Sequence, residues 1–104
     1  MSKRMIKYKS ELKFLGRCLP STARLLFQHA PSSFVLAIVD ATWTTLTGKV
    51  PLSPHELTAV RSVQPALRRI ASREQTIAER RRALLTQSGV KAVQTLFRVI
   101  RKHF

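Results

Sequence analysis

The chain has 104 residues, of which 44% are hydrophobic, and its 19 Lys and Arg against five Asp and Glu give a formal net charge of +14. This apolar content excludes a disordered basic tail, the single cysteine (Cys18) excludes an internal disulfide, and no apolar run approaches the ~18 residues of a membrane span. So large a positive charge predicts a partner rich in phosphate, either nucleic acid or an anionic membrane surface.

The first predicted element is a basic amphipathic helix over residues 3–18, which Gly16 and Pro20 would end. Its apolar residues recur at three- and four-residue steps, with lysines between them: Met5, Tyr8, Leu12 and Leu15. After this helix, Ser21 is expected to cap a short second helix that runs to Gln28.

The next helix is predicted from Phe34 to Thr47 and carries the least charge of any segment. A helix that is apolar on most sides is buried, so we expect it to form the centre of the core. Trp43 belongs to this helix, and we expect it to pack in the core rather than to serve as a stacking platform. Gly48 is well placed to end the helix.

A capping box with proline at the first helical position begins at Ser53, where Pro54 follows the cap and Glu56 stands three residues after it. The helix that it opens contains Pro65, which lacks the N–H that a helix interior needs. We therefore expect a kink or break near residues 62–64.

A second capping box, from Thr76 to Glu79, begins the following helix, and Gly89 is expected to end it. The last segment, Val90 to Phe104, is predicted to be a basic amphipathic helix. Its apolar stripe would contact the core or another subunit, or alternatively a membrane. The residues of this candidate membrane or partner surface are Val93, Phe97, Ile100 and Phe104.

These elements predict an all-α protein, a compact bundle of four to five short helices with basic outer helices. We expect a basic amphipathic N-terminal helix over residues 1–19, a helical core domain over residues 20–89, and a basic amphipathic C-terminal helix over residues 90–104. A helix-turn-helix built around residues 54–88 is a further possibility.

The basic residues gather on both sides of a nearly neutral centre, and the cluster in the second half of the chain consists of arginine alone. Arginine can hold a phosphate with two hydrogen bonds, and the few acids leave most bases without a partner. We therefore predict a phosphate-binding surface made of Arg61, Arg68, Arg69, Arg73, Arg80, Arg81 and Arg82. A second contact is expected from Lys3, Arg4, Lys7, Lys9 and Lys13.

Patterns that carry catalytic or metal chemistry are missing from the sequence. Cys18, His29, His55 and His103 are too widely separated for a zinc site, and no glycine-rich phosphate loop occurs. We therefore expect that the protein is not an enzyme and that it has no catalytic residue, no metal and no cofactor. The predicted function is sequence-independent binding and charge neutralisation of nucleic acid, with double-stranded DNA as the expected partner.

Three stretches in order along the chain, residues 46–54, 67–71 and 80–89, resemble small basic proteins of adintoviruses and related Polinton-type DNA elements. In that group a Gly-x-Val-x-Leu-Thr-Pro turn opens a basic helix, and a later basic helix ends in Gln-x-Gly-Gly. Here Val90 stands in place of the second glycine, and Pro65 interrupts a helix that is usually free of proline. The first departure weakens any membrane activity that the resemblance implies.

The resemblance implies a small virion protein, comparable to the basic core proteins of adenoviruses, that is found in the virion and the host nucleus. One alternative is a membrane-active or capsid-bridging minor virion protein acting through the C-terminal helix. Another is an organellar, ribosomal-type protein of the mitochondrion, because the N-terminus is basic and poor in acids. Capsid protein, an anionic membrane and further copies of the chain are the additional partners that these interpretations allow.

Overall fold

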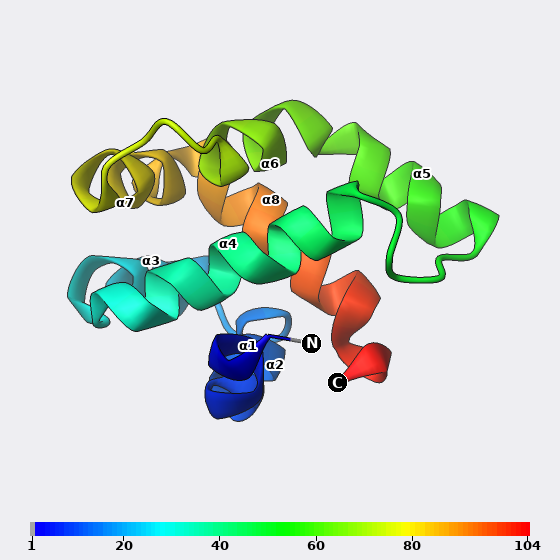
Figure 1. Cartoon of the computed structure of the whole chain (residues 1–104), viewed down its shortest axis with the longest axis horizontal. Helices are drawn as coiled ribbons and strands as arrows, with labels where there is room; N and C mark the ends of the chain where they lie inside the picture. The colour runs from blue at the N-terminus through cyan, green and yellow to red at the C-terminus, as the bar shows by residue number, and fades with distance from the viewer. Residues whose placement is uncertain (1) are drawn as a thin grey trace.

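The structure is a computed structural model that describes residues 2–104, and in that range it is built of helices with no β-strand (Figure 1). Its elements are α1 (Lys3–Lys7), α2 (Lys9–Leu15), α3 (Pro20–His29), α4 (Ser32–Leu46), α5 (Pro54–Ser62), α6 (Gln64–Ala71), α7 (Ile77–Leu85), α8 (Gln87–Ile100) and the 3-10 helix η1 (Arg101–His103). The all-α prediction is confirmed. The prediction of four to five helices is wrong, since residues 2–104 contain eight α-helices.

The first predicted helix is divided into α1 and α2 at Tyr8, whose backbone (φ −103°, ψ 20°) leaves the helical range. The Tyr8 side chain is fixed at the start of α4. Its hydroxyl forms a hydrogen bond with Ser33, and its ring packs edge to face on Phe34 with the centroids 5.3 Å apart. The break thus occurs where the N-terminal segment is anchored to α4.

The break predicted near residues 62–64 is confirmed, because α5 ends at Ser62 and α6 begins at Gln64. Val63 between them has φ −115° and ψ 9°, outside the helical range. Pro65 explains the position, since it cannot donate the backbone hydrogen bond that a continuous helix requires there.

Both predicted capping boxes are present. The Ser53 hydroxyl accepts a hydrogen bond from the Glu56 backbone N–H (3.2 Å), and the Glu56 carboxylate accepts one from the Ser53 backbone N–H (2.9 Å). Thr76 and Glu79 make the same reciprocal pair at the start of α7. Gly48 follows the end of α4 with φ +75°, a conformation that glycine adopts without strain.

Glu56 also ties the start of α5 to the end of the chain, because its second carboxylate oxygen lies 3.0 Å from the Lys102 ammonium. The backbone N–H of Ser53 and the Lys102 charge lower the pKa of Glu56 from 4.5 to about 2. A carboxylate with a lowered pKa stabilises the fold above its unfolded pKa and loses that contribution as the pH falls through its folded pKa.

We therefore expect Glu56→Gln to lower the thermal unfolding midpoint of the protein above about pH 4.5 and to have progressively less effect down to about pH 2. Glutamine keeps a group that can accept the capping hydrogen bond, so the difference isolates the charge. Thermal unfolding of both proteins across this pH range measures it, with Glu74→Gln, which removes an exposed carboxylate, as the control. A difference that is the same at every pH would show that the charge of Glu56 does not contribute.

Two expected helix ends differ from the structure. Ser21 does not cap α3, because the cap is Leu19, two residues earlier, and Pro20 is the first helical position. Gly89 does not end a helix. It lies in the first turn of α8, where its N–H donates to the Thr86 hydroxyl (3.0 Å), and Thr86 alone connects α7 to α8.

The hydrophobic core is assembled around α4, as expected for residues 34–47, and around α8, which was not expected to share its centre. Helix α8 passes behind α4 in Figure 1 and packs against α2, α3, α5, α6 and α7, whereas α4 packs against α1, α6 and α7. The largest fully buried side chains come from both halves of the chain and include Leu12, Leu15, Phe27, Ile38, Leu67 and Phe97. The segments over residues 2–19 and 90–104 therefore share one core with the segment between them.

Helices α2 and α8 approach each other closely at Gly16, where an added Cβ would lie 2.8 Å from the backbone of Phe97. The amide of Gln94 on α8 reaches across this contact and donates to the carbonyls of Leu15 (3.2 Å) and Cys18 (2.7 Å). Leu15 is the last residue of α2, so its carbonyl has no partner within the helix, and Cys18 lies in the segment that joins α2 to α3. A buried polar residue of α8 thus completes the hydrogen bonding of α2.

Candidate functional site

Two hollows that share Arg69 lie where α6, α7 and α8 meet. The first, about 310 Å³, is bordered by the junction of α5 and α6 and by the first half of α8, and the second, about 280 Å³, by α6, α7 and the segment between them. We call the two hollows together the basic groove. Its polar lining consists of Ser62, Arg69, Gln75, Glu79, Arg82, Thr86, Ser88 and Lys91.

Three cations of the basic groove come from three different helices: Arg69 from α6, Arg82 from α7 and Lys91 from α8. All three side chains are exposed. The contacts of α6 with both α7 and α8, together with the single-residue connection at Thr86, bring these helices to one place. The groove is therefore a tertiary feature that unites cations distant in the sequence.

Glu79 is the one carboxylate in the lining of the basic groove, and the capping box occupies it. Hydrogen bonds from the backbone and hydroxyl of Thr76 and, more weakly, the charge of Arg82 lower the pKa of Glu79 below its usual value. The groove thus contains three cationic side chains against one carboxylate that is already hydrogen-bonded. This balance leaves the groove suited to an anion with several acceptor oxygens.

Two of the seven predicted arginines are used to hold the fold together. Arg80 is only 7% exposed, and its guanidinium donates to the carbonyl of Ile70 (2.7 Å) in the last turn of α6. Arg81 donates to the carbonyl of Phe27 (3.0 Å) in the last turn of α3. Both satisfy carbonyls that a helix leaves free at its C-terminus, so the structure does not place these two guanidinium groups on an open anion-binding face.

The remaining predicted arginines do not all converge. Arg69 and Arg82 line the basic groove, while Arg61 and Arg68 are exposed on α5 and α6 outside both hollows. Arg73 lies over the ring of Trp43 instead. Lys91 was not among the residues predicted for the site. No local signal marks it, because only the packing of α8 against α6 brings it to Arg69.

The N-terminal basic residues are also divided. Arg4 forms an ion pair with Asp40 (3.0 Å), Lys7 lies over the ring of Tyr8, and Lys3 and Lys9 are exposed. Lys13 lines a hollow of about 150 Å³ together with two residues that the sequence did not indicate as site residues. We call this group the second basic cluster; it consists of Lys13, Arg17 and Arg101.

The predicted membrane or partner stripe of the C-terminal helix points into the core. Val93, Phe97 and Ile100 are buried, and Phe104 is half-buried with its ring centroid 6.1 Å from that of Phe97. These side chains are therefore not displayed to a membrane or another subunit. Among residues 2–104, no helix combines the length and the apolar character that crossing a bilayer requires.

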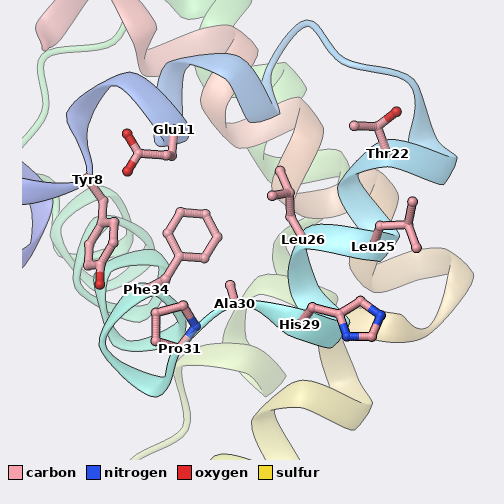
Figure 2. A pocket seen from close by; sticks show the side chains of 9 residues that line it. All are labelled: Tyr8, Glu11, Thr22, Leu25, Leu26, His29, Ala30, Pro31 and Phe34. Atoms are coloured by element: carbon pink, nitrogen blue, oxygen red, sulfur yellow. The ribbon is translucent and has the colours of Figure 1, made fainter.

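A further hollow, about 520 Å³, was not predicted from the sequence (Figure 2) and shares no lining residue with the basic groove. Leu25, Leu26 and Phe34 give it an almost entirely apolar wall, with Glu11 and His29 among its few polar residues. No Lys or Arg lines it. An apolar wall with a carboxylate offers nothing to a phosphate, so this hollow does not belong to the candidate site.

No protein-family model, no curated protein and no solved structure matches this chain. The resemblance to small basic virion proteins therefore stays a prediction that rests on the motifs quoted above. The charges of the protein and their placement are therefore the basis for assigning a function. Within residues 2–104 only two ion pairs occur, between Arg4 and Asp40 and between Lys102 and Glu56.

Proposed function

We propose that the protein binds nucleic acid without regard to sequence, by holding backbone phosphates in the basic groove. The observation that supports this most strongly is the position of Arg69, which lines both hollows and has Lys91 beside it in one and Arg82 in the other. A phosphate next to Arg69 can accept two hydrogen bonds from its planar guanidinium. Lys91 and Arg82 then supply charge for the phosphates on either side.

The overall charge supports the same function. A formal +14 on 104 residues, with two ion pairs in the described part of the chain, leaves most cations to be neutralised from outside the protein. A phosphate backbone does this and releases its condensed counterions, which favours binding at low salt. The second basic cluster, at the end of α2 and on η1, offers a further place for the backbone beyond the groove.

The expected ligand is double-stranded DNA, and the expected role is charge neutralisation in a viral or element-encoded particle, with the virion and host nucleus as its location. This role rests on the motif resemblance and on the net charge. The membrane-active alternative loses its proposed surface, since the apolar stripe of α8 is buried. The organellar alternative rests on the basic N-terminus alone.

The basic groove is tested by a variant that carries Arg69→Gln, Arg82→Gln and Lys91→Gln together. The matched control, Lys9→Gln, Arg24→Gln and Lys49→Gln, removes the same charge from exposed residues outside the groove. We expect the groove variant to bind a short DNA duplex at least about ten-fold more weakly than the control variant, because it lacks the convergent phosphate ligands. Fluorescence anisotropy of a labelled duplex measures both affinities.

Circular dichroism and thermal unfolding establish that both variants are folded before their affinities are compared. Equal losses of affinity in the two variants would mean that only the total charge matters, and the groove would then not be the binding site. If the unmodified protein fails to bind duplex DNA or RNA at low salt, the proposed function itself is wrong.

A further inference from the structure

Trp43 is exposed at the surface although it belongs to the apolar helix α4. Its neighbours Ala41, Thr42 and Thr45 are buried, whereas 40% of Trp43 is accessible to solvent. The expectation that it packs in the core is therefore wrong, because Trp43 lies on the side of α4 that the other helices do not cover completely. Trp43 thus presents a large aromatic surface outside the core.

The Trp43 ring is paired with an arginine. The guanidinium carbon of Arg73 lies 5.0 Å from the ring centroid, within the range of a cation–π contact. Arg73 belongs to the segment between α6 and α7, drawn in yellow in Figure 1, and this segment also provides Gln75 to the basic groove. A few residues of chain thus connect the aromatic ring to Arg69 and its phosphate-binding surroundings.

We propose that Trp43 and Arg73 form a stacking platform for an unpaired nucleobase, so that the protein also takes single-stranded nucleic acid as a ligand class. This inference rests on the proposed function, since the basic groove would hold the backbone of the same strand. Aromatic rings and guanidinium planes are the two surfaces on which proteins stack splayed bases. In a duplex both faces of each base are covered by its neighbours, so only an unpaired or strand-end base can occupy the platform.

The experiment compares two single strands of equal length and charge: an oligodeoxythymidine of about 20 nucleotides and an abasic strand with the same phosphates. Trp43 is the only tryptophan of the chain, so intrinsic tryptophan fluorescence reports on the platform alone. We expect the thymidine strand to quench this fluorescence and the abasic strand to bind without quenching it. Labelled strands followed by anisotropy give the two affinities independently.

Trp43→Leu is expected to weaken binding of the thymidine strand by about ten-fold and to leave binding of the abasic strand unchanged, because only the stacking contact is removed. Phe14→Leu is the matched control, since Phe14 is also an exposed aromatic residue but lies on α2, away from Arg73. This control is expected to bind both strands as the unmodified protein does.

Each remaining outcome contradicts the platform. Equal weakening of both strands by Trp43→Leu would mean that Trp43 supports the fold and does not contact bases. Equal affinities and no quenching in the unmodified protein would mean that only phosphates are bound, which overturns the platform and leaves the proposed function intact. Failure of both strands and of duplex DNA to bind would overturn the proposed function together with the platform.

Discussion

Replacing Gly89 by alanine is expected to lower the free energy of unfolding by about 3 kcal/mol, although alanine is the best helix former and Gly89 lies inside a helix. A Cβ added at Gly89 would lie 2.0 Å from the carbonyl oxygen of Ala83 and 2.9 Å from the Thr86 hydroxyl. The first of these is a backbone atom of α7. It cannot move away unless the single-residue connection between α7 and α8 opens.

The sign of the effect distinguishes this close approach from ordinary helix propensity. Without the contact, Gly→Ala in a helix would raise stability by up to about 1 kcal/mol. Denaturant unfolding followed by circular dichroism measures the difference, with Gln87→Ala, an exposed change in the same helical turn, as the control. A Gly89→Ala protein as stable as the unmodified one would show that α7 and α8 are not packed as described.

Arg80 and Arg82 are expected to respond in opposite ways to substitution by glutamine. Arg80→Gln should lower the free energy of unfolding by about 2 kcal/mol, because it removes the charged donor from the buried carbonyl of Ile70. Arg82→Gln should change stability by less than about 0.5 kcal/mol, since its side chain is exposed. Binding should show the reverse order, with a several-fold loss of nucleic-acid affinity for Arg82→Gln and little change for folded Arg80→Gln.

The pair is informative because both substitutions remove one positive charge from the same helix. Denaturant unfolding and duplex binding, measured on both variants, separate a structural arginine from a ligand-binding one. If Arg80→Gln kept full stability and lost affinity, Arg80 would be a phosphate ligand, and its assignment as a cap of α6 would be wrong.

Those parts of the fold that depend on short stretches of sequence were predictable. The capping boxes at Ser53 and Thr76, the break before Pro65 and the end of α4 before Gly48 each follow from a few neighbouring residues. Such signals act on backbone hydrogen bonds within one helical turn. Tertiary packing has little influence on them.

Features that depend on close packing between helices were not predictable in this way. Gly89 matches a helix stop in its local sequence, yet its actual role is to let α7 and α8 meet through one residue. The residues around Trp43 in the sequence are typical of a core helix, yet the Trp43 ring lies at the surface beneath the guanidinium of Arg73. In both cases the deciding atoms belong to another element.

The sequence predicted the type of ligand that the candidate site would bind, but it did not identify all the residues that line the site. The excess of arginine indicated an anion-binding surface, and Arg69 and Arg82 do line the basic groove. A run such as Arg80–Arg82 cannot supply three ligands to one face, because successive residues of a helix point about 100° apart. The same geometry predicts that some of these arginines would point toward the neighbouring helices, as Arg80 and Arg81 do. Lys91 could not be found from the sequence, since it meets Arg69 only after α8 packs against α6.

The most direct test of phosphate binding in the basic groove is the salt dependence of duplex binding for the unmodified protein, the groove variant and the charge-matched control. Each phosphate contact contributes about −0.9 to the slope of log affinity against log salt concentration. The proposal predicts that substituting Arg69, Arg82 and Lys91 flattens this slope by roughly 2–3 and that the control retains a steeper slope. A groove variant whose slope equals that of the unmodified protein would contradict the proposal, because the phosphates would then be neutralised elsewhere on the molecule.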